Sequence, residues 1–223
     1  MTAIVTGAAR GIGRAVAERL AQEGDVLYVD LDPSVTELGG IVADVTQPED
    51  RQRILDAVDG EISVLVNNAG ITQDARIVKM TEEQFLAVIR VNLGAAYELT
   101  TAAIPRFADG ASVVSLASRA YLGNFGQFNY SASKGGLVGM TRALALQLAP
   151  KVRVNAIAPS LTASEMTSAM PEKVLDKMIA SIPLGRMAEP REIAETIAAL
   201  ASPAMAYVTG QVVVACGGRS LAP

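Results

Sequence analysis

Tyr130 and Lys134 are the two residues of this sequence whose types and spacing best suit acid–base chemistry. They stand four residues apart in the run Asn129-Tyr-Ser-Ala-Ser-Lys134, so a helix would place the phenol and the ammonium on one face. A phenol with an ordinary pKa of about 10 is a poor base near neutral pH, but a fixed positive charge beside it favours the phenolate. The pair could therefore form a general base. Such pairs also occur by chance on helix surfaces, where the tyrosine packs and the lysine is solvated, so other parts of the chain must decide.

The composition narrows the chemistry further. The chain has 223 residues, half of them hydrophobic, with no histidine and a single cysteine, Cys216. This predicts a sizeable aliphatic core and excludes a Ser-His-Asp triad, a disulfide within the chain and a cysteine-cluster metal site; we expect no metal. The net charge of −4 argues against a nucleic-acid partner or an anionic membrane surface. No apolar stretch approaches the ~20 residues of a membrane span and no secretory signal is seen, which predicts a cytoplasmic protein.

Apolar runs of strand length alternate with stretches of helical period along the chain. Several runs are continuously apolar, as expected of strands covered on both faces. The pattern predicts an α/β fold in a single domain, residues 1–223, with one doubly wound parallel sheet of about seven strands and helices on both faces. Residues 160–185 break the rhythm and are expected to form a substrate lid. The strands are expected at 3–6, 26–29, 62–66, 111–116, 152–157 and 211–215, and the helices at about 12–23, 49–59, 82–103, 130–149 and 190–201.

A glycine-rich turn, Thr6-Gly-Ala-Ala-Arg-Gly-Ile-Gly13, joins the first strand to the first helix. Glycines at such a turn let backbone amides and a helix N-terminus approach a pyrophosphate closely. No Gly-Lys-Ser/Thr follows, which argues against a P-loop NTPase. At the end of the second strand, Asp30 could accept hydrogen bonds from the adenine ribose and repel a 2′-phosphate, which favours NAD over NADP. Asp32 competes for that role, and Arg10 adds a positive charge near the phosphates.

These motifs continue in a fixed order along the chain. After the glycine-rich turn come Asp44-Val45, Asn67-Asn-Ala-Gly70, Asn92, a serine near the end of the fifth strand, Tyr130-x-x-x-Lys134 and Pro159. Over essentially its whole length the chain thus resembles the short-chain dehydrogenase/reductase family, whose fold is of the Rossmann type. Gly123-Asn-Phe-Gly-Gln127 and Asn67-Asn-Ala-Gly-Ile-Thr72 make it most similar to 3-oxoacyl-carrier-protein reductases and related hydroxyacyl or secondary-alcohol dehydrogenases.

The resemblance implies a role for each matching residue. Tyr130 would be the acid–base residue, and Lys134 would hold the nicotinamide ribose and lower the pKa of Tyr130. Asn92 would keep a water in a proton relay, and Ser118 would hydrogen-bond the substrate oxygen. The remaining residues would contact the cofactor: Gly7, Arg10, Gly11, Ile12 and Gly13 at the pyrophosphate and its ribose, Asp30 at the adenine ribose, Asp44 and Val45 at the adenine, Asn68, Ala69 and Gly70 along its path, and Pro159 and Thr162 at the nicotinamide amide.

The serine is the main departure from the family pattern. Ala117 stands thirteen residues before Tyr130, at the usual spacing, and Ser118 stands twelve before. Aligning the strand that ends at Ser118 instead places that serine in the catalytic position, with one residue deleted from the loop, and leaves Ser115 in the strand. The stretch from Asp30 to Asp44 is also short, so its crossover helix is expected to be only a turn. Ser160 and Cys216 replace residues common in the family, Gly and Asp, and are interpreted as local packing changes.

The predicted function is hydride transfer between NAD(P), with NAD favoured, and a secondary alcohol or ketone, while Tyr130 exchanges the hydroxyl proton. A small-molecule substrate and a homotetramer are implied by the resemblance. Two alternatives remain at this point: a non-catalytic dinucleotide-binding redox sensor or scaffold on the same fold, and a nucleotide-binding transferase that uses a sulfonium donor.

Overall fold

A seven-stranded parallel sheet forms the centre of the molecule in the computed structural model, which describes residues 1–164, 167 and 170–221. The strand order is β3-β2-β1-β4-β5-β6-β7, and every neighbouring pair is parallel. This order confirms the predicted doubly wound sheet. The strands are β1 (Thr2–Thr6), β2 (Asp25–Asp30), β3 (Ile41–Val42), β4 (Ile62–Asn67), β5 (Phe107–Leu116), β6 (Val152–Pro159) and β7 (Val212–Ala215).

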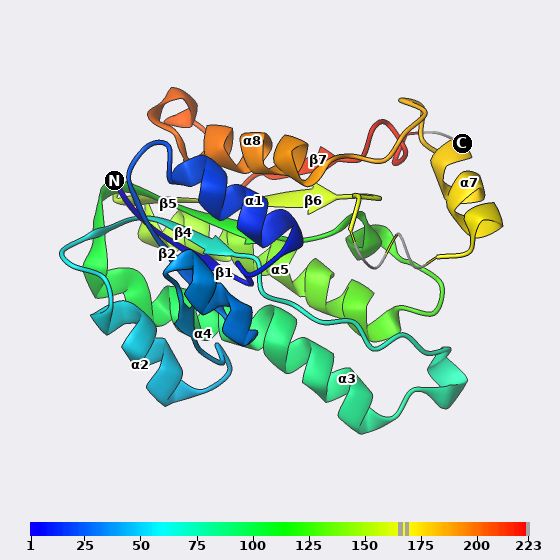
Figure 1. Cartoon of the computed structure of the whole chain (residues 1–223), viewed down its shortest axis with the longest axis horizontal. Coiled ribbons are helices and arrows are strands. Elements are labelled where there is room, and N and C mark those ends of the chain that lie inside the picture. Colours follow the sequence, from blue (N-terminus) through cyan, green and yellow to red (C-terminus); the bar gives the residue numbers. More distant parts are fainter. Residues whose placement is uncertain (165–166, 168–169, 222–223) are drawn as a thin grey trace.

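Helices cover both faces of this sheet, with α1 and α8 above it and α2 to α5 below it in Figure 1. Consecutive strand residues point to opposite faces, and both faces are buried. In β1, for example, Ile4 packs with the layer that contains Leu144 of α5, whereas Val5 packs with the layer that contains Ile197 of α8. The α-helices are α1 (Gly11–Leu20), α2 (Pro48–Asp56), α3 (Glu82–Ile89), α4 (Ala95–Ala103), α5 (Phe128–Leu148), α7 (Glu172–Ala180) and α8 (Pro190–Ala201).

Two stretches differ from the sequence prediction, and a third agrees with it. The expected helix at 82–103 is α3 and α4 joined by a π-helical turn, Arg90–Gly94. The strand β3 has only two residues and no hydrophobic run marks it in the sequence. Between β2 and β3 the chain forms a short 3-10 helix, Pro33–Leu38, in agreement with the expected loss of a full crossover helix. Within the part of the chain that the structure describes, no helix has the length and apolar character to cross a membrane.

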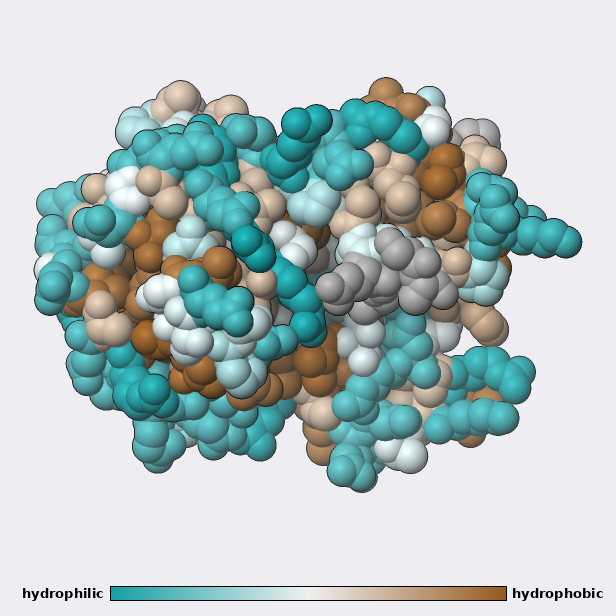
Figure 2. All heavy atoms as spheres, in the orientation of Figure 1, coloured by the Kyte–Doolittle hydropathy of each residue, from teal (hydrophilic) through white to brown (hydrophobic). Residues whose placement is uncertain are grey.

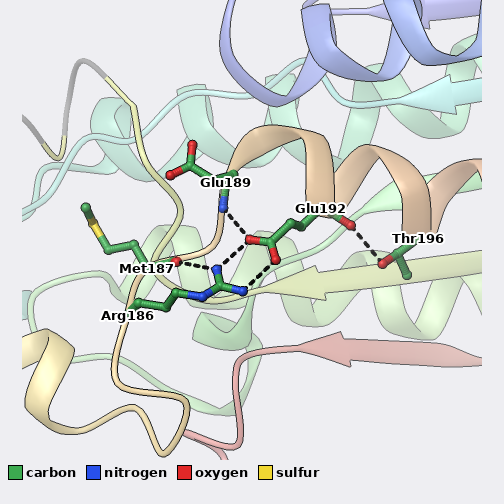
Figure 3. Close-up of polar contacts among 5 residues, drawn as sticks. All are labelled: Arg186, Met187, Glu189, Glu192 and Thr196. Carbon is green, nitrogen blue, oxygen red and sulfur yellow. Dashed lines mark hydrogen bonds and ion pairs between the residues drawn. The ribbon is translucent and has the colours of Figure 1, made fainter.

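The segment between β6 and α8 leaves the sheet after Pro159 and comes back beside its own starting point. Residues on its two sides pair, because Ala163 donates its N–H to Ala188 O (2.8 Å) and Ala188 donates to Leu161 O (3.0 Å). Figure 3 shows the returning end, where Arg186 forms a bidentate ion pair with Glu192 of α8 at 2.7 Å for each contact. This segment carries α7 beyond the carboxyl ends of the strands, at the right of Figure 1. The lid over 160–185 stays a prediction, and its residues 165–166 and 168–169 lie outside the described part.

Candidate active site

Tyr130 and Lys134 lie in the first two turns of α5, and their side chains are close together. The Lys134 ammonium lies 5.5 Å from the centre of the Tyr130 ring and donates a hydrogen bond to the carbonyl of Leu116, at the end of β5, over 2.6 Å. Only 3 % of Lys134 is exposed, and this burial lowers the pKa of its ammonium to about 8. The solvated-surface interpretation of this pair is therefore wrong, because Lys134 is enclosed.

Asn92 connects this helix to the loop after β4. It lies in the π-helical turn and is 1 % exposed. Its amide oxygen accepts from Ile71 N (2.8 Å), and its amide nitrogen donates to Ile71 O (3.0 Å) and Ser133 Oγ (3.1 Å). The extra residue of a π-helical turn re-aims a side chain and is frequent at functional sites. The sequence identified Asn92 but not this turn, for which it contains no clear signal.

Gly70 fills the space between Asn92 and Lys134 with backbone alone. A Cβ at this position would lie 3.1 Å from the Asn92 amide oxygen and 3.6 Å from the Lys134 nitrogen. A larger side chain would displace one of them, which explains the glycine here. The predicted cofactor-path residue thus also shapes the surroundings of the buried ammonium.

Ser118 lies next to Tyr130, whereas Ser115 does not share its surroundings. Ser118 follows β5, its hydroxyl accepts from Ala120 N (3.1 Å), and it lies near enough to the Tyr130 phenol to lower the pKa of that group. Ser115 is fully buried within β5, and its hydroxyl has no hydrogen-bond partner among the described residues. This geometry agrees with the register that deletes one residue after Ser118.

The pKa of Tyr130 differs from the sequence expectation. Burial of the phenol raises its pKa above the usual value of 10, and the negative charge of Asp74 raises it further. Ser118 acts in the opposite direction but does not reverse the shift. The expected lowering by Lys134 is not found in the chain alone: loss of solvation is the largest influence on the phenol, and Lys134 is not among the groups that shift its pKa.

At the other end of the site, the glycine-rich turn makes a cradle of backbone. Gly7 has φ +66°, and a Cβ on Gly13 would lie 1.9 Å from the Gly7 carbonyl oxygen. Gly11, at φ +58°, faces open space. The N-terminus of α1 has no side-chain cap and no acidic residue in its first turn, so its N–H groups are free for an anion. These residues fit the pyrophosphate of a dinucleotide.

Thr6 and Asn68 hold this cradle against β4. The Asn68 amide donates to Thr6 O (2.8 Å) and Gly7 O (2.9 Å), and the Thr6 hydroxyl accepts from the N–H groups of Asn68 and Ala69, both at 3.1 Å. The Asn68 side chain therefore fixes the turn itself. Sequence reasoning expected it to line the cofactor path and did not identify this role.

Asp30 ends β2 beside the glycine-rich turn. Its carboxylate accepts from Ala9 N (2.8 Å) and Asp32 N (3.0 Å). Asp32 forms an exposed ion pair with Arg10 at 3.0 Å, so the competing carboxylate and the nearby cation neutralise each other. This pairing spans 22 residues of sequence and was not foreseen.

The remaining predicted residues lie at the same edge of the sheet. The Asp44 carboxylate accepts from Thr46 N (2.9 Å) and Oγ1 (2.7 Å); burial raises the pKa of this carboxyl, but its hydrogen bonds outweigh that effect and the pKa is lowered overall. Val45 packs in the core beside α2. Pro159 ends β6, and Thr162 is buried and bridges to Ala188. Because parallel strands end at one edge, residues from the ends of six strands, β1 to β6, converge there.

A glycine cradle at the first strand–helix turn, an acidic residue after β2 and a buried Tyr–Lys pair define a dinucleotide-binding α/β protein of the dehydrogenase class. Residues 7–220 match the family model described as Enoyl-(Acyl carrier protein) reductase. The chain is 42 % identical over 235 residues to 3-oxoacyl-[acyl-carrier-protein] reductase of Thermotoga maritima, covering 96 % of each. It is 38 % identical over 245 residues to (3R)-3-hydroxyacyl-CoA dehydrogenase of Mus musculus, covering 97 % of this chain and 95 % of the relative.

A solved structure is equally similar. The glucose/ribitol-dehydrogenase-type short-chain dehydrogenase/reductase of Brucella melitensis superposes with a TM-score of 0.94 at 35 % identity, covering 98 % of this chain and 96 % of that one. The chain belongs to the short-chain dehydrogenase/reductase family. It is an oxidoreductase that acts on CH–OH groups and binds a nicotinamide dinucleotide, as predicted, and nothing in the comparisons supports a non-catalytic protein.

The buried Lys134 predicts a specific pH dependence of stability. Its pKa is about 8 in the folded chain against 10.5 ordinarily, so between these values the unfolded state binds more protons. The free energy of unfolding should therefore rise with pH, by about 1 kcal/mol per unit from pH 8 to 10. Urea unfolding of the cofactor-free protein at a fixed protein concentration measures this, and Lys134→Met should remove the rise. Parallel pH curves for the two proteins would contradict the burial of a titrating ammonium.

Proposed function

We propose that Tyr130 is the general acid–base residue of this oxidoreductase and that Ser118 holds the substrate oxygen. The observation that carries this assignment is the enclosed Lys134 ammonium 5.5 Å from the Tyr130 ring, with Ser118 near enough to lower the pKa of the phenol. A phenol that remains protonated at neutral pH can donate its proton to a carbonyl oxygen as that oxygen becomes an alcohol. In the reverse direction it must receive the proton, for which a neighbouring cation is favourable.

A bound nicotinamide dinucleotide supplies the hydride acceptor or donor at C4 of its ring. Among the chain's own residues, Gly7, Gly11 and Gly13 would hold the pyrophosphate, and Lys134 the nicotinamide ribose. Asn92 is a positioning residue in this scheme: its hydrogen bonds to Ile71 and Ser133 hold the loop after β4 against α5. Lys134, with its pKa of about 8, can pass a proton onward near neutral pH.

We further propose a 3-oxoacyl or 3-hydroxyacyl substrate. A cavity of about 460 Å³ opens beside the first turn of α5 and is bounded by residues 75–78 and 123–128 with Ser131. Apolar side chains are exposed along these loops, among them Val78 at 83 % and Phe125 at 89 %, which suits a hydrocarbon chain. The names of the Thermotoga and mouse relatives, which specify 3-oxoacyl and 3-hydroxyacyl groups, support this choice.

NAD is the proposed cofactor, in preference to NADP. Asp30 and Asp32 place two carboxylates beside the glycine-rich turn, where the adenine ribose would lie, and of these Asp32 is paired with the cation Arg10. A 2′-phosphate would meet a net negative surface there. A homotetramer is proposed from the family resemblance, and exposed apolar side chains on α4 and α5, Tyr97 and Leu146, suit a face covered by another copy. The cytoplasmic location stays a prediction of the sequence.

Replacing the proposed base tests the assignment most directly. Tyr130→Phe should lower kcat for acetoacetyl-CoA reduction by about 10³-fold or more, because it removes only the hydroxyl that exchanges the proton. The affinity for NADH, measured by isothermal titration calorimetry, should change by less than about threefold. Tyr97→Phe is the matched control, since Tyr97 is exposed on α4. Retained turnover in Tyr130→Phe would sink the assignment.

The register of the serine can be tested with two equal substitutions. Ser118→Ala should reduce kcat by about 10²-fold, as loss of one oxyanion-type donor does. Ser115→Ala should leave kcat nearly unchanged, because that hydroxyl is buried in β5 without a partner among the described residues. A larger loss from Ser115→Ala in the same steady-state assay would show that the deletion after Ser118 is misplaced.

Cofactor preference should depend on Asp30. Wild type should show a higher kcat/KM with NADH than with NADPH, and Asp30→Ala should narrow that ratio about tenfold or more by removing a carboxylate from the ribose site. Asp32→Ala should narrow the NADH/NADPH ratio less, because it frees the Arg10 cation from its ion pair. Adding Arg10→Ala to the Asp32→Ala variant should return the ratio toward the wild-type value. A wild-type preference for NADPH, or a larger effect from Asp32→Ala, would require a different adenine-ribose pocket.

A further inference from the structure

A second group of polar residues lies beyond the ends of β6 and β7, outside the Tyr130 site. A cavity of about 610 Å³ opens there between α7 and the turn after β7. Three of its lining residues are cationic, namely Lys173, Lys177 and Arg219. Arg119, which follows Ser118 directly, is close enough to Arg219 for their charges to repel. We call these four residues the α7 cation cluster.

The backbone of the last turn is built to hold Arg219 beneath α7. Gly217 and Gly218 have φ of +60° and +87°, and a Cβ on them would lie 2.6 Å from Ile182 and 2.9 Å from Pro183. Leu184 N also donates to Gly217 O over 3.1 Å. The backbone of the turn after β7 therefore packs directly against the side chains of the segment after α7. This packing fixes the position of Arg219.

The cations of this cluster lack acidic partners among the residues that the structure describes. None of the four forms an ion pair within 4.0 Å there. Among the described residues, the side chain of Arg219 makes only a 3.5 Å hydrogen bond, to Ser160 Oγ, and the Nε of Arg119 is buried without a partner. Burial and the charge of Arg119 both lower the pKa of Arg219. Unpartnered buried donors and mutually repelling cations are unfavourable unless an anion joins them.

The lysines of α7 face the cavity, and its acidic residues do not. Lys173 and Lys177 are four residues apart and line the cavity together with Val174, Met178 and Ser181, whereas Glu172 and Asp176 do not line it. The helix thus presents its lysines and two apolar side chains to the cavity. Hydrophilic side chains also project around α7 at the right of Figure 2. The lining of the cavity therefore has an excess of positive charge, although the net charge of the whole chain is −4.

The cluster borders the proposed reaction site. Arg119 is the next residue after Ser118, and Ser160, which accepts from Arg219, is the next after Pro159. The strands β5, β6 and β7 that carry these turns are neighbours in the sheet. One extended molecule could therefore have its carbonyl at Ser118 and Tyr130 while another part of it reaches the cations.

We propose that the α7 cation cluster binds an anionic group, a phosphate or a carboxylate, that the substrate carries away from its reacting carbon. This inference rests on the proposed function for the position of the reacting carbon. Guanidinium groups bind both oxyanions through paired N–H donors, and the flanking lysines add charge. The anion has two possible sources: the phosphate of a carrier arm attached through a thioester, or a carboxylate at the far end of the substrate itself.

Binding measurements with matched ligands test the cluster without turnover. In isothermal titration calorimetry, 4′-phosphopantetheine is compared with pantetheine, and 5-oxohexanoate with its ethyl ester. Wild type should bind the charged member of at least one pair tenfold or more tightly, and that pair identifies the source of the anion. Arg219→Gln should abolish the preference, as should the double variant Lys173→Gln, Lys177→Gln on the exposed face of α7. Arg142→Gln, an exposed arginine on α5, should retain it.

A kinetic comparison separates the cluster from the reaction site. Arg219→Gln should raise KM for acetoacetyl-CoA about tenfold with kcat unchanged if the anion is a phosphate, while kcat/KM for acetoacetyl-N-acetylcysteamine changes less than twofold. Equal losses with both thioesters, or no preference for a charged ligand in either titration pair, would overturn the anion assignment. Absence of turnover with every 3-oxoacyl compound, together with a retained charge preference in the titrations, would instead contradict the proposed substrate and leave the cluster standing.

Discussion

Burial of the Lys134 ammonium is the constraint on which the rest of the candidate active site depends. A charged group that is 3 % exposed needs compensation that the interior must supply. The structure provides a carbonyl at the end of β5, Leu116 O, and leaves space for the ammonium by placing Gly70 opposite it. Asn92 then needs the π-helical turn to reach the loop that contains Gly70. One buried cation thus accounts for features of three segments: the end of β5, the loop after β4 and the junction of α3 and α4.

The two ends of the cleft carry opposite charge. At the β2 end lie two carboxylates, Asp30 and Asp32, and one cation, Arg10, which pairs with Asp32. At the α7 end lie two arginines and two lysines with no ion-paired carboxylate among the described residues. The parallel sheet separates these ends, because β2 and β7 lie on opposite sides of β1 and β4. A molecule bound along the carboxyl edge therefore experiences a field that changes sign along its length, which favours one orientation for cofactor and substrate.

The pKa of Tyr130 illustrates how such a field combines with burial. In the chain alone, loss of solvation raises the pKa of the phenol, and Asp74 adds to that shift. A positively charged oxidised nicotinamide beside the phenol would act in the opposite direction. A protonated phenol suits reduction of a ketone, and a phenol made more acidic by the oxidised cofactor suits oxidation of an alcohol. In the proposed assignment, the chain supplies a protonated phenol and the redox state of the bound cofactor would change its acidity.

The sequence by itself determined the fold class, the glycine-rich turn and the Tyr–Lys pair, and it predicted Ser118 rather than Ser115 at the reaction site. These features depend on residue types at short spacing, where helix and strand periods apply directly. Only the tertiary structure decided what depends on distant residues or on burial: the π-helical turn at Asn92, the pairing of Asp32 with Arg10, the direction of the Tyr130 pKa shift and the repulsion between the charges of Arg119 and Arg219. The solvation of a side chain and the charge around it depend on all of its spatial neighbours. The order of the strands in the sheet decides which residues are neighbours, and no local sequence pattern contains that order.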